Sequence, residues 1–317
     1  MLIAMLQYLI ILLDKRSTSF CSLTPSISPK DEGNCLMPFD TLRQGIRFGM
    51  MENLMIQYVY PEYELPTEYT EIIESIDHSK IKSTRDGADV WVSESIKSIK
   101  ADVPVVWRTD KQSLFNSEAD IISALENVPR LNVVLTDVET FTDDDFEKYK
   151  QLLSVLAEHI ERLYAEGKSP QLNLLTDRMM LSNMNNCGAG DTTITLAPNG
   201  KFYVCPAFYY DNEADSIGDL EHGLDIRNRH LYKLEYAPIC RHCDAYQCKR
   251  CIWLNHKTTL EVNTPSHEQC VIAHLERNAS HELLKSIHKH GKFLSEQKEI
   301  KEIDYLDPFD KKDTWKL

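Results

Sequence analysis

The stretch CRHCDAYQCKRC, residues 240–251, holds four of the nine cysteines in this chain. Cys187 and Cys205 precede it and Cys270 follows it, so seven cysteines lie between residues 187 and 270. The first 180 residues hold the other two. Thiolates at gaps of two to four residues suit zinc or an iron–sulfur cluster, because short loops can turn several sulfurs onto one centre.

The spacing inside the run separates these two kinds of site. A zinc ribbon pairs two C-x2-C units across roughly 15–20 residues, whereas only four residues separate Cys243 from Cys248. Such crowding is typical of ferredoxin-like runs, in which the last cysteine binds a different cluster. We therefore expect Cys251 to serve another centre than its neighbours. A zinc-stabilised binding protein without a redox role remains an alternative.

Composition limits the class of partner and the compartment. The 317 residues suit about two domains. With 35 basic and 49 acidic residues the net charge is −14, which argues against nucleic acid or an anionic membrane as partner. Clustered cysteines without a disulfide framework predict a reducing, cytoplasmic location. The apolar N-terminus is too short to span a membrane and has no basic flank, so we expect residues 7–14 to form a buried strand.

Short apolar runs alternate with helical patterns over residues 1–180, which is the form of successive βα units with a parallel sheet. The expected strands are Tyr8–Leu13, Met55–Tyr60, Val90–Val92, Val103–Trp107, Leu131–Leu135 and Leu172–Leu175. The sequence thus predicts an α/β fold with a partial (β/α)6 TIM-like barrel. Helices are expected from Asp40, from Ser117 and from the acidic triplet at 143–145.

Aspartates follow several of these strands. Asp14, Asp110, Asp137 and Asp177 stand at the carboxyl ends, where the chemistry of such barrels is found. They are candidates for a ring of carboxylates. The alternative is that each one only closes a strand or caps a helix.

The second part of the chain has a different pattern. Asn199-Gly200 predicts a hairpin between 193–196 and 201–204 that ends at Cys205. A helix is expected near 224–236, and another from Ser266, with Cys270 in its first turn, where a thiolate is favoured. His274 shares a helix face with Cys270, so zinc ligation by this pair is an alternative to an exposed histidine. Residues 292–317 read as a charged tail.

The order of seven cysteines and one glycine resembles the SPASM extension of radical SAM peptide maturases. That pattern is C-x9-15-G-x4-C, a gap, C-x2-C-x5-C-x3-C, a second gap and a final cysteine. The matching positions are Cys187, Gly200, Cys205, Cys240, Cys243, Cys248, Cys251 and Cys270. Two spacings in the run are each one residue short. The resemblance implies a radical-SAM-like barrel over 1–180, a SPASM-type domain over 181–291 and the tail.

Over most of its length the chain resembles the CXXX repeat peptide maturases. The similar segments are YLIILLD at 8–14, YVYPEYELP at 58–66 and CKRCIWLN at 248–255. This resemblance implies an iron–sulfur protein of ribosomal peptide (RiPP) maturation that binds or modifies a Cys-repeat peptide.

The same resemblance implies two auxiliary 4Fe-4S clusters. Cys187, Cys205 and Cys251 would hold cluster I, and Cys240, Cys243, Cys248 and Cys270 would hold cluster II. Two such clusters use eight ligands and seven cysteines are present. One iron would therefore have another ligand or an open position able to bind substrate.

The chain departs from this family at the site of S-adenosylmethionine (SAM). The C-x3-C-x2-C motif is missing, because Cys21 is followed by Pro25 and Ser28, and the next cysteine is Cys35. The Gly-Gly-Glu loop is replaced by YPEY at 60–63. We do not expect this chain alone to cleave SAM. It is either a maturase, working with an electron donor, or a non-catalytic partner that presents peptide to a separate radical SAM enzyme.

Overall fold

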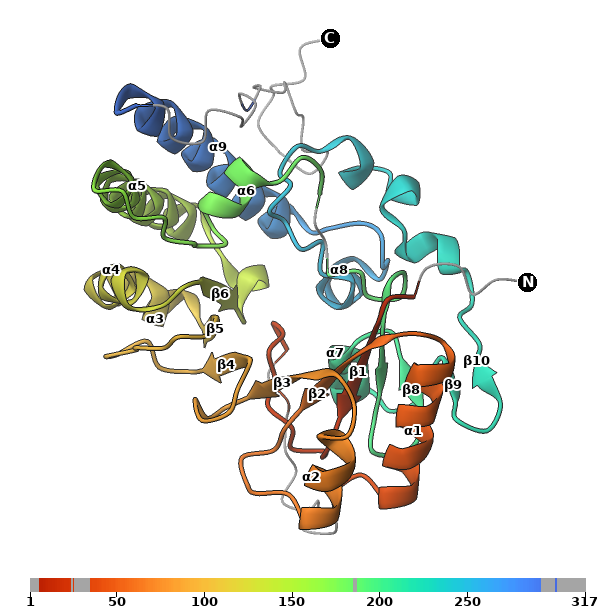
Figure 1. Cartoon of the computed structure of the whole chain (residues 1–317). Helices are drawn as coiled ribbons and strands as arrows, with labels where there is room; N and C mark the ends of the chain where they lie inside the picture. The colour runs from red at the N-terminus through yellow and green to blue at the C-terminus, as the bar shows by residue number, and fades with distance from the viewer. Residues whose placement is uncertain (1–5, 24, 26–34, 185–186, 292–299, 301–317) are drawn as a thin grey trace. The chain divides into compact units, whose positions relative to one another are not determined.

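The computed structural model describes residues 6–23, 25, 35–184, 187–291 and 300 (Figure 1). These residues divide into two compact units, which are treated separately below. The first unit comprises Met1–Ser93 and Gly188–Tyr236, and the second comprises Glu94–Cys187 and Ala237–Leu317.

The first unit contains a sheet whose strands run in the order β4-β3-β2-β1-β7-β8. Neighbouring strands are parallel except β7 and β8, which form the hairpin predicted at Asn199-Gly200. The strands are β1 (Tyr8–Leu12), β2 (Met55–Val59), β3 (His78–Lys82), β4 (Val90–Ser93), β7 (Thr193–Leu196) and β8 (Phe202–Tyr203). β1 lies between two parallel neighbours, and its residues 9–12 are buried, as expected for a central strand.

Helix α1 (Phe39–Met51) covers this sheet at very close range. It can approach because it presents Gly45 and Gly49 to the strands; a Cβ at Gly45 would lie 2.3 Å from Cδ2 of Leu196. The other elements of the unit are α2 (Thr67–Ile73), α7 (Pro206–Asp211), β9 (Gly218–Asp219), β10 (Gly223–Leu224), η2 (Arg229–Tyr232) and η3 (Leu234–Tyr236).

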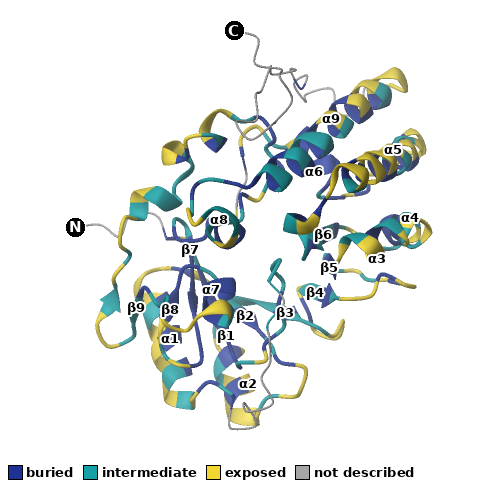
Figure 2. Cartoon of the chain, turned by 180° about the vertical axis from the view of Figure 1, so that it is seen from behind, coloured by how far each residue is buried: buried dark blue, intermediate teal, exposed yellow. Residues whose placement is uncertain are grey.

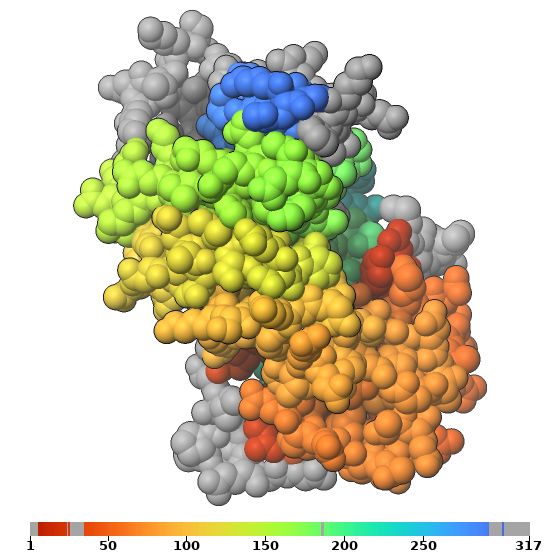
Figure 3. Space-filling model, turned by 60° about the vertical axis from the view of Figure 1, so that its left-hand side comes forward, coloured from red at the N-terminus to blue at the C-terminus, as the bar shows by residue number. Residues whose placement is uncertain are grey.

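The second unit contains two parallel strands and two long helices. The strands are β5 (Val105–Thr109) and β6 (Leu131–Leu135). The long helices, α5 (Asp143–Ala165) and α9 (His267–Lys289), lie side by side (Figures 1 and 3). The shorter elements are α3 (Lys111–Phe115), α4 (Glu118–Asn127), η1 (Val138–Thr140), α6 (Thr176–Met180), η4 (Cys240–His242) and α8 (Ile252–Thr259).

The buried faces of α5 and α9 form the core of this unit (Figure 2). Leu153, Leu156 and Ile160 of α5 are fully buried, as is Ile287 of α9. The start of α5 is fixed by a capping box between Thr142 and Asp145.

The predicted α/β fold is confirmed, two local predictions are wrong, and one strand was missed. Leu172–Leu175 makes only an isolated bridge, between Leu172 and Leu131, because the chain turns at once into α6. β3 was not predicted, since its sequence HSKIK is mostly polar and half-buried. Residues 224–236 form β10 and two short 3₁₀ turns instead of a helix.

The predicted domain limits at 180 and 291 remain a prediction, and the tail at 292–317 lies outside the described residues apart from Ile300. Within the described chain, no helix is both long enough and apolar enough to cross a membrane.

Candidate metal centre

Four cysteines of the second unit line one cavity. They are Cys240, Cys243, Cys248 and Cys270. The remaining lining residues are Met184, Arg250, Pro265, Gln269, Ala273 and His274. This set of four thiols coincides with the residues that the family resemblance implies for cluster II.

Local backbone structure brings the four thiols to the cavity. The Cys243 amide donates to the Cys240 carbonyl at 3.1 Å, and the Cys248 amide donates to Ala245 at 3.0 Å, so the run folds into consecutive turns. Ser266 caps α9 by accepting a hydrogen bond from the Gln269 amide at 3.3 Å. Cys270 therefore lies in the first turn of α9, as the sequence predicted.

Two of the sulfur atoms lie within hydrogen-bond distance of nitrogen atoms. Cys243 Sγ lies 3.4 Å from the Ala245 amide nitrogen and 3.5 Å from Nε2 of His274. Cys248 Sγ accepts from the Arg250 amide at 3.4 Å. Such N–H donors stabilise negative charge on sulfur, and they are one of the means by which proteins set the potentials of iron–sulfur clusters.

Burial and nearby cations act on these thiols in opposite directions. Burial raises the pKa of Cys240 to about 11, while the positive charge of Arg250 lowers it. Burial also raises the pKa of Cys243 and Cys248. The thiols of Cys240, Cys243 and Cys248 are consequently protonated at neutral pH, and a metal centre would have to displace their protons.

Buried charges beside the run hold it in place. Asp244 accepts hydrogen bonds from Nε and Nη2 of Arg277, both at 2.9 Å. The guanidinium group of Arg178 lies 4.3 Å from the centre of the Tyr246 ring and 3.7 Å from Asp244. One carboxylate thus faces two arginines beside the cysteine run.

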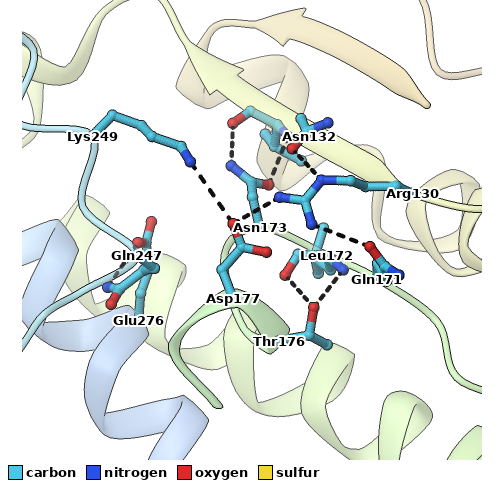
Figure 4. A network of polar contacts seen from close by, with 11 residues as sticks. Arg130, Asn132, Gln171, Leu172, Asn173, Thr176, Asp177, Gln247, Lys249 and Glu276 are labelled. Carbon is cyan, nitrogen blue, oxygen red and sulfur yellow. Dashed lines mark hydrogen bonds and ion pairs between the residues drawn. The ribbon is translucent and has the colours of Figure 1, made fainter. Parts of the chain in front are cut away.

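A second polar network connects the run to α5 and α9. Gln247 donates to Glu276 at 3.2 Å and to the Ala273 carbonyl at 2.7 Å, and the Tyr149 hydroxyl donates to Glu276 at 2.7 Å. Burial raises the pKa of Glu276 to about 7. Figure 4 shows Lys249 pointing to Asp177, 3.8 Å away.

Cys187 and Cys251 lie together elsewhere in the same unit. The Cys187 amide donates to the Lys249 carbonyl at 3.4 Å. Burial, with a smaller contribution from Cys187, raises the pKa of Cys251 to about 12. Cys251 precedes α8 and is absent from the lining of the four-cysteine cavity. Cys205 belongs to the first unit, where it precedes Pro206 at the start of α7.

The donor set at the cavity fits a 4Fe-4S cluster, which takes four cysteine thiolates. Among the described residues, no group of three or more His, Cys, Asp or Glu side chains is arranged to hold a metal ion. The fit therefore rests on the shared cavity and on the chemistry of its four thiols.

The carboxyl end of β1 does not fit a SAM-binding cluster. Asp14 is fully buried there and accepts from the Arg16 amide at 2.6 Å and from the Tyr63 hydroxyl. The segment at Cys35 lies against this end of the strand, since the Lys15 amide donates a hydrogen bond to the Cys35 carbonyl at 3.0 Å. A three-thiolate set is missing from the sequence at this place, with only Cys21 and Cys35 available.

The aspartates at the strand ends have local partners. Asp110 accepts from the Ser113 amide at 2.7 Å as the cap of α3, and Asp137 accepts from the Lys111 amide at 3.0 Å. Asp177 pairs with Nη2 of Arg130 at 2.7 Å (Figure 4). Asp110 thus caps the helix that follows it, whereas Asp137 and Asp177 bind residues of other segments.

Sequence reasoning missed the buried polar residues of α9. They are Glu276, Arg277, Ser280 and His281. Polar residues at positions that a helix should bury are the signal that could have revealed them.

Comparisons with known proteins identify the fold. No protein-family model matches the sequence, and no curated protein matches it. Among solved structures, the chain is similar to anSMEcpe with bound AdoMet, with a TM-score of 0.62 and 11% identity over 92% of this chain and 97% of that one. It is also similar to anSMEcpe with bound AdoMet and the Cp18Cys peptide, with a TM-score of 0.61 and 11% identity over 90% and 99% of the chains. The chain therefore shares the α/β fold of these structures, with its mostly parallel sheet.

Proposed function

We propose that this chain is a cytoplasmic iron–sulfur protein of ribosomal peptide maturation that binds or modifies a Cys-repeat peptide. The observation that carries the proposal is the cavity lined by Cys240, Cys243, Cys248 and Cys270. The fold likeness to anSMEcpe, which was solved with AdoMet and a peptide, supports a peptide-maturase scaffold.

Cluster II would be held by these four cysteines, and cluster I by Cys187, Cys205 and Cys251. The clusters would supply one-electron transfer or an open iron for a substrate thiol. The protein's own part is to direct N–H groups at the sulfurs, as the backbone amides of Ala245 and Arg250 do.

A second candidate function is a non-catalytic partner that presents peptide to a separate radical SAM enzyme. The filled carboxyl end of β1 favours it, because Asp14 is bonded there to Tyr63 and Arg16. No step through SAM is assigned to this chain.

Metal analysis tests the proposal. Protein purified without oxygen should contain about eight irons with matching sulfide if both clusters form. Cys248→Ala should lose about four of these irons, while Cys21→Ala, outside either ligand set, should keep them all. One or two zinc ions without iron would contradict the proposal and favour the zinc-stabilised alternative.

Product analysis separates the two candidate functions. The reduced protein is incubated with SAM and a synthetic peptide of CXXX repeats. A change in peptide mass without 5′-deoxyadenosine supports a maturase that does not cleave SAM, whereas an unchanged but bound peptide supports the presenting role. Formation of 5′-deoxyadenosine would show that the chain cleaves SAM itself.

A further inference from the structure

We propose that His274 donates a hydrogen bond to the sulfur of Cys243 and thereby raises the reduction potential of the cluster at the four-cysteine cavity. The inference rests on the proposed function, because it requires that the cavity hold a 4Fe-4S cluster. It assigns to His274 the role of a positioning residue that acts through Cys243.

The position of the imidazole is fixed by helix α9. His274 follows Cys270 by four residues, so both side chains extend from the same face of the helix. Nε2 lies 3.5 Å from Sγ of Cys243, within reach of a hydrogen bond to sulfur, and the ring lines the cavity with the four thiols. The ring is half-buried.

The chemistry gives the direction of the effect. A neutral imidazole has one N–H, and a thiolate sulfur is an acceptor for it. The N–H withdraws negative charge from the sulfur, which favours the reduced cluster because reduction adds a negative charge. A one-electron donor supplies that electron; no bond is broken and no proton is transferred.

The number of thiols argues against His274 as a ligand. Four irons need four protein ligands, and Cys240, Cys243, Cys248 and Cys270 already supply four thiols at this cavity. The imidazole is therefore left to act on a sulfur. Cys243 also accepts from the Ala245 amide, so the imidazole would be the second nitrogen donor at this single sulfur.

The test measures the midpoint potential of the cluster by EPR-monitored redox titration. His274→Leu removes the donor and should make reduction about tenfold less favourable, equivalent to about 59 mV for one electron. His274→Gln retains an N–H donor and should recover most of this shift. His288→Leu, which alters an exposed histidine near the end of the same helix, should match the wild type. All variants should keep the wild-type iron content.

Pulsed EPR provides a measurement without a variant, which keeps the proposal testable if His274→Leu does not fold. In wild-type protein with ¹⁵N-labelled histidine, the reduced cluster should show a weak ¹⁵N coupling. An unchanged potential in folded His274→Leu, or no ¹⁵N coupling, would overturn the proposal. A loss of about four irons in this variant would also overturn it, because His274 would then be a ligand. Wild-type protein without iron would contradict the proposed function itself.

Discussion

The Tyr149 hydroxyl donates a hydrogen bond to the Glu276 carboxyl group at 2.7 Å, and this contact joins α5 to α9 in the interior of the second unit. Both residues are buried. Glu276 also accepts from Gln247, the residue before Cys248, so one carboxyl group links the two long helices to the cysteine run. Its protonation state should therefore influence the stability of the whole unit.

Glu276 should make stability fall as pH rises. Burial raises its pKa from 4.5 to about 7 in the folded protein. Between these values the folded state holds a proton that the unfolded state releases, so the free energy of unfolding decreases with pH by up to roughly 3 kcal/mol. Urea unfolding of the metal-free protein at pH 5 and pH 8 measures this change.

Glu276→Gln should remove most of that pH dependence. The glutamine stays neutral, and its amide can donate to Oε1 of Gln247, a buried atom with no hydrogen-bond partner in the described chain. Glu282→Gln, on an exposed position of α9, serves as the matched control and should retain the wild-type slope. The same slope in Glu276→Gln and in the wild type would show that another group titrates.

Asp244→Asn should destabilise the metal-free protein by about 3 kcal/mol or more. The substitution removes the carboxylate that pairs with the buried Arg277 and Arg178, and broken buried pairs of this kind are costly. Removing the partner of an exposed pair by Glu282→Gln should cost under about 1 kcal/mol. Chemical denaturation of both variants gives the comparison, and equal losses would mean that Asp244 is well hydrated.

Cys248→Ala should lower the thermal stability of the second unit more than Cys21→Ala lowers that of the first. Metal binding is coupled to folding where several ligands converge, and Cys248 lines the cavity of four thiols. Calorimetry of anaerobically purified protein measures both shifts. Chelation of iron should lower the unfolding temperature of the wild type to that of Cys248→Ala. Identical shifts for Cys248→Ala and Cys21→Ala would contradict this expectation.

Elements with strong local signals were predictable from the sequence. The helix after the acidic triplet 143–145 was expected, and its start is set by Thr142 and Asp145 within three residues of each other. The turn at Asn199-Gly200 is likewise determined by local sequence, because Gly200 has a φ of +75°, which glycine adopts readily. β3 escaped prediction because a half-buried strand such as HSKIK has no apolar run.

The candidate site was predictable only in its cysteines. Their spacing is local, whereas the groups that surround them meet through tertiary packing. Tyr149 and Glu276 are 127 positions apart. His274 could be placed on the face of Cys270, but its distance to Cys243 depends on how the run folds against α9, which no pattern within either segment specifies.

The close packing of α1 on β7 should make Gly45→Ala destabilising. The added Cβ would lie 2.3 Å from Cδ2 of Leu196, which is fully buried, so the leucine must move within a packed core. Overpacking of this kind costs roughly 1–3 kcal/mol. In a double-mutant cycle, Leu196→Ala should remove most of the cost of Gly45→Ala, because the clash needs both side chains. Denaturant unfolding measures all four corners of the cycle. Additive effects would show that the cost of Gly45→Ala comes from the helix backbone and not from contact with Leu196. Helix propensity alone predicts the opposite sign, because alanine favours a helix more than glycine does.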